Sequence, residues 1–147
     1  MLKNYCCSTN SNEKFIDFAL LLLRLIAAGF MITHGFAKFS GFENMKDVFP
    51  DPLGIGNTAS LVMIIIAELV CPILILFGLF TRLATIPTII GMGVAAFVIH
   101  GGDAFQVREL SLLYMGLFLI LLVSGAGKFS ADYYISKYCP YCRKENK

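Results

Sequence analysis

The stretch LVMIIIAELVCPILILFGLF, residues 61–80, decides the fold of this chain. It is apolar almost throughout, and a helix of about 20 such residues is long enough to cross a bilayer. Glu68, close to its middle, is its only charged residue. A charged group at the bilayer centre costs about 2.5–3.5 kcal/mol on insertion scales, so it normally faces a bundle interior and has a partner. The function of the chain is therefore expected to depend on what Glu68 faces.

The rest of the chain is similarly apolar. Of its 147 residues, 57% are hydrophobic, and the mean hydropathy is +0.74. The apolar residues form four long blocks, at about 15–39, 58–80, 83–99 and 107–124. Because a backbone in lipid must satisfy its own hydrogen bonds, each block is predicted to be a helix. We therefore predict an all-α membrane protein, a bundle of four transmembrane helices.

The basic residues predict how this bundle is oriented. Four spans place both ends of the chain, and the short turn at Thr81-Arg82, on one side of the membrane. Eight of the 12 basic residues share that side: Lys3, Lys14, Arg82, Lys128, Lys137, Arg143, Lys144 and Lys147. Since Lys and Arg favour the cytoplasmic side, we expect both termini to be cytoplasmic. The chain would then comprise a cytoplasmic tail (1–14), a transmembrane domain (15–132) and a cysteine-containing cytoplasmic tail (133–147).

The first helix has one polar face. At about 100° per residue, Arg24, Met31, Gly35 and Lys38 fall within a narrow arc that Ala27, Ala28 and His34 widen only slightly. Small residues let helices approach closely in lipid, so this face is predicted to look inward. Arg24 lies near the middle of the first span and Glu68 near the middle of the second. We therefore predict a buried Arg24–Glu68 ion pair, which serves as an assembly pin, forms the charged floor of a pocket, or includes a proton-handling carboxylate.

A second polar group is expected at the opposite end of the bundle from the termini. It consists of His34, Lys38, His100, Arg108 and Glu109, from three helices at similar depth. These side chains could line an outward-facing pocket for an anionic or quinone-type head group, with histidine as proton partner. Alternatively, they are interfacial residues solvated by lipid head groups. The sequence contains no flavin, iron–sulfur or haem motif, so quinone is the cofactor that it leaves open.

Four cysteines lie in the tails. Cys139 and Cys142 form a Cys-Pro-Tyr-Cys sequence like that of glutaredoxins, and Cys6 and Cys7 are adjacent. Three interpretations remain open: a mobile redox-active dithiol, a zinc site that joins both pairs, and reduced thiols without a role. The net charge of only +2 gives no indication of a nucleic-acid partner.

Several short motifs together resemble the DoxX family of small bacterial membrane proteins. They are Arg24-Leu25, Gly29, His34-Gly35 and Lys38, then Glu68, then Gly78-Leu79-Phe80-Thr81-Arg82, Glu109-Leu110 and Gly125-Ala126-Gly127-Lys128-Phe129-Ser130-Ala131-Asp132. The last stretch resembles the family's closing Gly-Pro-Gly-Arg-Tyr-Ser-Leu-Asp-like motif and differs from it at Ala126, Lys128, Phe129 and Ala131. The resemblance covers about residues 17–132.

The resemblance implies a multi-pass protein of the bacterial inner membrane. Because the family name derives from a subunit related to thiosulfate:quinone oxidoreductase, it also implies a subunit of a quinone- or thiol-linked redox system. Such a subunit would act with a redox partner protein or as a homo-oligomer, and would not be catalytic alone. The alternative is a non-enzymatic membrane scaffold or assembly factor. A small-solute transporter is a third interpretation.

Overall fold

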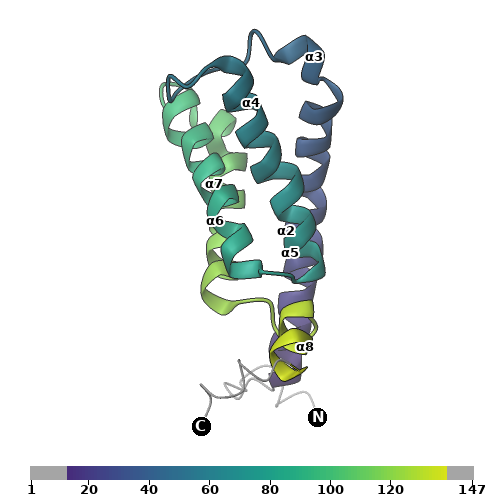
Figure 1. Cartoon of the computed structure of the whole chain (residues 1–147). Coiled ribbons are helices and arrows are strands. Elements are labelled where there is room, and N and C mark those ends of the chain that lie inside the picture. Colours follow the sequence, from purple (N-terminus) through teal and green to yellow (C-terminus); the bar gives the residue numbers. More distant parts are fainter. Residues whose placement is uncertain (1–12, 139–147) are drawn as a thin grey trace.

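A computed structural model describes residues 13–138. Four helical spans lie side by side and form a bundle, with no strand in this part of the chain (Figure 1). All four are long and apolar enough to cross a membrane, which confirms the prediction of four spans. The cysteines at positions 6, 7, 139 and 142 fall outside the described residues.

The first span is a single helix, α2 (Glu13–Ser40). Its buried residues are Arg24, Ala27, Ala28, Met31 and Gly35, which confirms the predicted inward face. The helix has 28 residues, so it is about 42 Å long and extends past the other spans at its beginning. Its large residues outside this face, Phe30 and Phe36 among them, are exposed and available to lipid.

The second span is interrupted at Glu68. It consists of α4 (Asn57–Ile65), the π-helical turn η1 (Ile66–Val70) and α5 (Cys71–Phe77). The N–H of Cys71 bonds to the carbonyl of Ile66, and Pro72 has no N–H to offer. The carbonyl of Ala67 therefore lacks a helical donor, and the hydroxyl of Thr88 donates to it at 2.8 Å. Proline thus produces a π-helical turn that a neighbouring helix stabilises.

The third and fourth spans follow closely. α6 (Thr81–Val94) continues into a second π-helical turn, η2 (Ala95–Ile99), and α7 (Phe105–Ser124) returns beside them. The turn from α5 to α6 is short because Gly78 and Phe80 both adopt left-handed backbone conformations, with φ of 69° and 48°. This tight turn makes α5 and α6 antiparallel neighbours.

The two ends of the bundle differ (Figure 1). At one end, the short helix α3 (Phe42–Met45) and the 46–56 segment connect α2 to α4. At the other end, the residues after α7 fold back and lead into α8 (Ala131–Tyr138), near the beginning of α2. Ala126 and Ser130 in this stretch are buried because the stretch closes the base of the bundle.

Candidate functional site

Arg24 does not contact Glu68, so the predicted ion pair is wrong. Its guanidinium donates to the carbonyls of Ala126 at 2.6 Å, Phe129 at 3.0 Å and Leu76 at 3.1 Å. Glu68 lies level with Gly35, which is eleven residues, or about 16 Å, further along α2. An arginine side chain cannot span that distance. The prediction failed because it aligned the midpoints of two spans, whereas α2 extends past the bundle at its beginning.

Arg24 instead holds the α8 end of the bundle together. Its side chain is buried, with the residue only 2% exposed, and it binds both the last turn of α5 and the closing loop, residues 125–130. The carbonyl of Leu76 lacks a helical partner because α5 ends at Phe77. A positive charge there also complements the helix dipole. We call Arg24, the closing loop and the 78–81 turn the Arg24 clamp.

Asp132 completes the Arg24 clamp from the other side. Its carboxylate accepts hydrogen bonds from the backbone N–H groups of Phe80 at 2.7 Å and Thr81 at 2.9 Å, at the start of α6. A β-carbon at Gly78 would lie 2.5 Å from the β-carbon of Ser130 and 2.8 Å from the Arg24 guanidinium. Glycine is therefore required here both for its backbone conformation and for lack of space.

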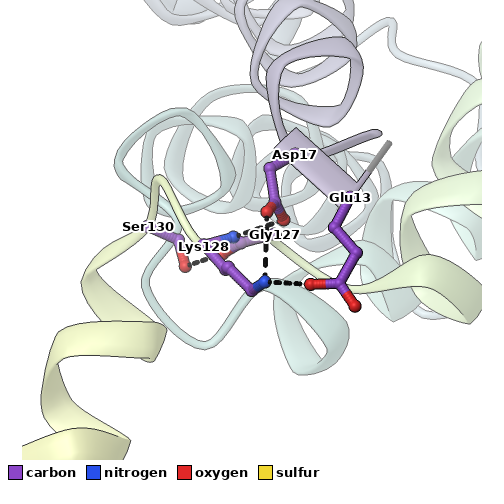
Figure 2. Close-up of polar contacts among 5 residues, drawn as sticks. All are labelled: Glu13, Asp17, Gly127, Lys128 and Ser130. Carbon is purple, nitrogen blue, oxygen red and sulfur yellow. Dashed lines mark hydrogen bonds and ion pairs between the residues drawn. The ribbon is translucent and has the colours of Figure 1, made fainter. Parts of the chain in front are cut away.

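Lys128 ties the closing loop to the beginning of α2 (Figure 2). Its ammonium lies 2.7 Å from a Glu13 carboxylate oxygen and 3.7 Å from one of Asp17, and its backbone N–H donates to Asp17 at 3.0 Å. The hydrogen bond to Glu13 and the charges of Glu13 and Asp17 raise the pKa of Lys128. The Lys128 and Glu13 side chains are solvent-accessible, so their ion pair adds little to stability, whereas the Asp17 side chain is mostly buried.

Glu68 pairs with Lys38. The Lys38 ammonium donates to a Glu68 carboxylate oxygen, and Glu68 is only 4% exposed. Lys38 lies in the last turn of α2, and its side chain is 24% exposed. The long lysine stem therefore reaches from the end of its helix toward a carboxylate in the middle of the second span. This pair replaces the predicted one and neutralises the buried charge.

Gly35 sets the level at which α2 meets Glu68. A β-carbon at this position would lie 2.5 Å from the carbonyl carbon of Glu68 and 2.6 Å from its oxygen. The two backbones can approach this closely only because residue 35 is glycine. Lys38 is one turn further along the helix, so the contact at Gly35 also determines that Lys38, and not Arg24, meets the carboxylate.

A cavity of about 550 Å³ lies beside this ion pair. It is enclosed by α2, α4 with η1, α6 with η2, and α7, and by the segment before α4. Its volume falls within the range of about 300–1,000 Å³ for small-molecule sites. Most of its wall is apolar, and its polar side chains are His34, Lys38, Ser60, Glu68, His100, Ser111 and Tyr114. Both π-helical turns border it, and such turns frequently occur at functional sites.

His34 and Tyr114 meet at the cavity wall. Their rings are 5.9 Å apart at 77°, an edge-to-face arrangement, and Tyr114 also stacks on Phe118 at 6.5 Å. His34 borders the cavity but remains open to the outside of the bundle as well. Tyr114 was not singled out from the sequence, because α7 is apolar on all sides and shows no polar face.

The segment between α3 and α4 covers the cavity at its end. Phe49, Pro50, Pro52, Leu53 and Ile55 all line it. This proline-rich segment therefore lies across the mouth of the bundle. We call residues 49–56 the cover segment.

One carboxylate holds the cover segment in place. Asp51 accepts hydrogen bonds from the hydroxyl of Ser60 at 2.8 Å and from the backbone N–H groups of Gly56 at 2.7 Å and Ile55 at 3.1 Å. The hydrogen bond from Ser60, followed by that from Gly56, lowers the pKa of Asp51. Neither Asp51 nor Ser60 was predicted from the sequence to belong to the site, because only the folded turn brings them together.

The remaining predicted site residues divide into two groups. His100 borders the cavity, and its Nδ1 lies 2.8 Å from a carboxylate oxygen of Asp103. Arg108 and Glu109 do not line the cavity, so the prediction that they belong to the pocket is wrong. Both lie in the first turns of α7, where the Arg108 side chain turns back to the Gly101 carbonyl and Glu109 is exposed. Within residues 13–138, no three His, Cys, Asp or Glu side chains gather as metal ligands would.

The sequence profile of the DoxX family matches residues 19–101, which include the Gly35–Glu68 contact and most of the cavity wall. The chain belongs to the DoxX family. With its four apolar spans, this DoxX-family chain is a multi-pass protein of the inner membrane. The recognition of the family from short motifs is thereby confirmed.

Three relatives cover most of the chain. Two proteins of Haemophilus influenzae, both described as uncharacterized, are 36% identical over 134 residues (84% of this chain, 95% of the relative) and 33% identical over 130 residues (83% and 86%). The inner membrane protein YqjF of Escherichia coli is 28% identical over 129 residues (85% and 98%). No solved structure matches the chain.

Proposed function

We propose that this DoxX-family protein is the quinone-binding subunit of a membrane redox system that receives electrons from thiols or other sulfur compounds. The observation that carries the proposal is the cavity beside the Lys38–Glu68 pair. Apolar walls with a few convergent polar groups are typical of ligand sites. A ring with two oxygens and an apolar tail matches such a lining.

Access from the lipid supports a lipophilic ligand. Near the covered end of the bundle, the cavity is bordered by Met63 of α4 and Ile90 of α6, which are 54% and 60% exposed on the bundle surface. α6 packs against η1 and α5, and less closely against α4. An apolar tail could therefore leave the cavity between α4 and α6 and lie in the surrounding lipid.

The chemistry would be a two-electron, two-proton exchange in which two thiols become a disulfide and a quinone becomes a quinol. The thiols would belong to a partner protein. The part of this chain is to hold the ring, to exclude water, and to supply hydrogen bonds and protons to the ring oxygens. His34 and Glu68 are the residues proposed to exchange protons, and Lys38 holds the Glu68 carboxylate in place through their contact.

The test is quinone binding by the purified protein in detergent. A decyl-substituted benzoquinone should bind saturably to the wild type, above its partition into empty micelles. Glu68→Gln and His34→Ala should bind at least about 10-fold more weakly, since the first breaks the buried charge pair with Lys38 at the cavity wall and the second removes a hydrogen-bonding group that faces the ring. Glu109→Gln is the matched control, because this exposed carboxylate lies outside the cavity lining.

The opposite result favours the alternative function, a non-enzymatic scaffold or assembly factor. If the wild type binds no quinone, and Glu68→Gln and His34→Ala are merely less heat-stable, the Lys38–Glu68 pair is an assembly pin. The pair would then fix the register of α2 against the second span and do no chemistry.

We also propose that the α8 end faces the cytoplasm, on the basis of the distribution of basic residues. The cover segment would then lie on the outer side of the membrane. Single cysteines at Val48 and at Tyr134, introduced into a chain without its own cysteines, test this orientation. A membrane-impermeant thiol reagent applied to intact cells should label position 48 and spare position 134, and the reverse pattern would overturn the orientation.

A further inference from the structure

Tyr114 is a buried polar side chain without a hydrogen-bond partner. It lines the cavity and is only 8% exposed as a residue, and its hydroxyl makes no hydrogen bond within residues 13–138, although the oxygen itself is not among the fully buried unpaired atoms. The unpaired hydroxyl oxygen is therefore accessible, and a ligand in the cavity can supply the hydrogen bond that a tyrosine in a mostly buried setting normally makes. Its ring is held on two sides by His34 and Phe118. The hydroxyl is thus fixed in place and available to a ligand.

The charges that face the cavity balance each other. Lys38 and Glu68 are the charged pair of the lining, and they contact each other. Arg108, the other basic residue expected nearby, turns to a backbone carbonyl instead of the cavity. An anion that paired with Lys38 would have to displace Glu68 and leave a buried carboxylate unpaired, which is costly. A neutral ligand meets no such penalty.

We propose that Tyr114 is a specificity-determining residue that hydrogen-bonds a neutral, oxygen-bearing ring in the cavity, and that the site rejects anions. This inference rests on the proposed function and narrows it. Under this inference, this chain, and not a partner protein, binds the quinone, quinol or phenol ring. Sulfur oxyanions and fatty carboxylates are excluded from the cavity, so an anionic electron donor must be oxidised on a partner protein.

Tyr114→Phe tests the proposal with little risk to the fold. The substitution removes one oxygen and keeps the ring that packs on His34 and Phe118. Tyr134→Phe is the matched control, since Tyr134 lies on α8, is 56% exposed, and is remote from the cavity lining. Loss of one neutral hydrogen bond should weaken binding about 3- to 10-fold.

The probes are a decyl-substituted benzoquinone, a redox-inactive phenol with the same tail, and two anions, thiosulfate and decanoate. We expect both neutral probes to bind the wild type, Tyr114→Phe to bind them about 3- to 10-fold more weakly, and Tyr134→Phe to bind as the wild type does. Neither anion should displace the phenol at concentrations where unlabelled phenol does.

The outcomes separate this inference from the proposed function. If the phenol binds through Tyr114 but the quinone does not, the inference holds and the redox function fails. If the quinone binds and Tyr114→Phe binds it as tightly as the wild type, the inference is overturned and the redox function stands. Displacement of the phenol by either anion also overturns the inference, and so does the absence of binding by both neutral probes.

Discussion

The Arg24 clamp and the Lys38–Glu68 cavity both bury a charge within the same bundle, but the partners and the packing around the two charges differ. Arg24 binds three backbone carbonyls in a tightly packed setting, where a β-carbon at Gly78 would already collide with it. Glu68 has one side-chain partner and lies next to a cavity of about 550 Å³. A charge bound to backbone and packed on all sides stabilises a fold. A charge beside open space remains available to a ligand.

This contrast predicts that the largest loss of stability follows a change in the Arg24 clamp. Arg24→Ala leaves three carbonyls without their donor, and a hydrogen bond to a charged group is worth about 1.5–3 kcal/mol. We expect a loss of at least about 3 kcal/mol, with Arg24→Lys intermediate because an ammonium cannot replace the guanidinium fork. Thermal unfolding in detergent measures it.

Quinone binding by Arg24→Lys also tests whether the Arg24 clamp and the cavity are independent. Molecules of Arg24→Lys that remain folded should bind the decyl-substituted benzoquinone with wild-type affinity, because Arg24 lies outside the cavity lining. If Arg24→Lys lost binding without unfolding, the two regions would not be independent, and the distinction between clamp and cavity would fail.

Gly35→Ala should have the next largest effect, on stability and on binding together. The new methyl group would meet the Glu68 backbone at 2.5 Å, and overpacking of this kind costs about 1–3 kcal/mol. Separating α2 from η1 would also move Lys38 away from Glu68. Gly29→Ala on the same helix is the control, because a β-carbon there meets nothing within 4 Å and should cause no loss. Equal behaviour of the two variants would contradict the register that we assign to α2.

A smaller effect is expected at the cover segment. Asp51→Asn weakens the acceptor that holds Ser60, Gly56 and Ile55, so bound quinone should dissociate faster while the bundle stays folded. Stopped-flow measurement of quinone release compares the variant with the wild type. Unchanged release would mean that the cover segment does not control access.

The pH dependence of this step follows from the lowered pKa of Asp51. A carboxyl whose pKa is lower in the folded state stabilises that state above its ordinary pKa and loses this contribution as the pH falls through the folded value. The wild type and Asp51→Asn should therefore differ in release rate at neutral pH, and they should converge only at a pH below the ordinary aspartate pKa of about 3.9. A difference that persisted at low pH would exclude the Asp51 carboxylate as its cause.

The smallest effect is expected for Lys128→Ala, at the solvent-exposed edge of the Arg24 clamp. Its ion pair with Glu13 is open to water and screened by salt, and the hydrogen bond from its backbone N–H to Asp17 does not depend on the side chain, so thermal stability should change little at physiological ionic strength. A loss comparable to that of Arg24→Ala would show that the clamp depends on this edge.

The sequence predicted the features that a single helix determines. The four spans and the inward face of α2 follow from apolar blocks and from helical periodicity. The partner of Glu68 could not be predicted, because it depends on the level at which Gly35 meets the second span. The sequences of two helices do not specify how far one is shifted along the other. Tyr114 was missed because an apolar helix shows no polar face, and Asp51 because its hydrogen bonds form only in the folded turn.

The central claim, that the cavity and not the clamp takes the ring of a neutral ligand, is tested most directly by photolabelling. A decyl-substituted azidobenzoquinone would be irradiated with the purified wild-type protein in detergent, with and without excess unlabelled quinone, and the modified peptides located by mass spectrometry. We predict competable labelling within residues 31–38, 49–55, 87–95 and 110–114, which border the cavity. Competable labelling confined to the closing loop, or no competable labelling at all, would contradict the account.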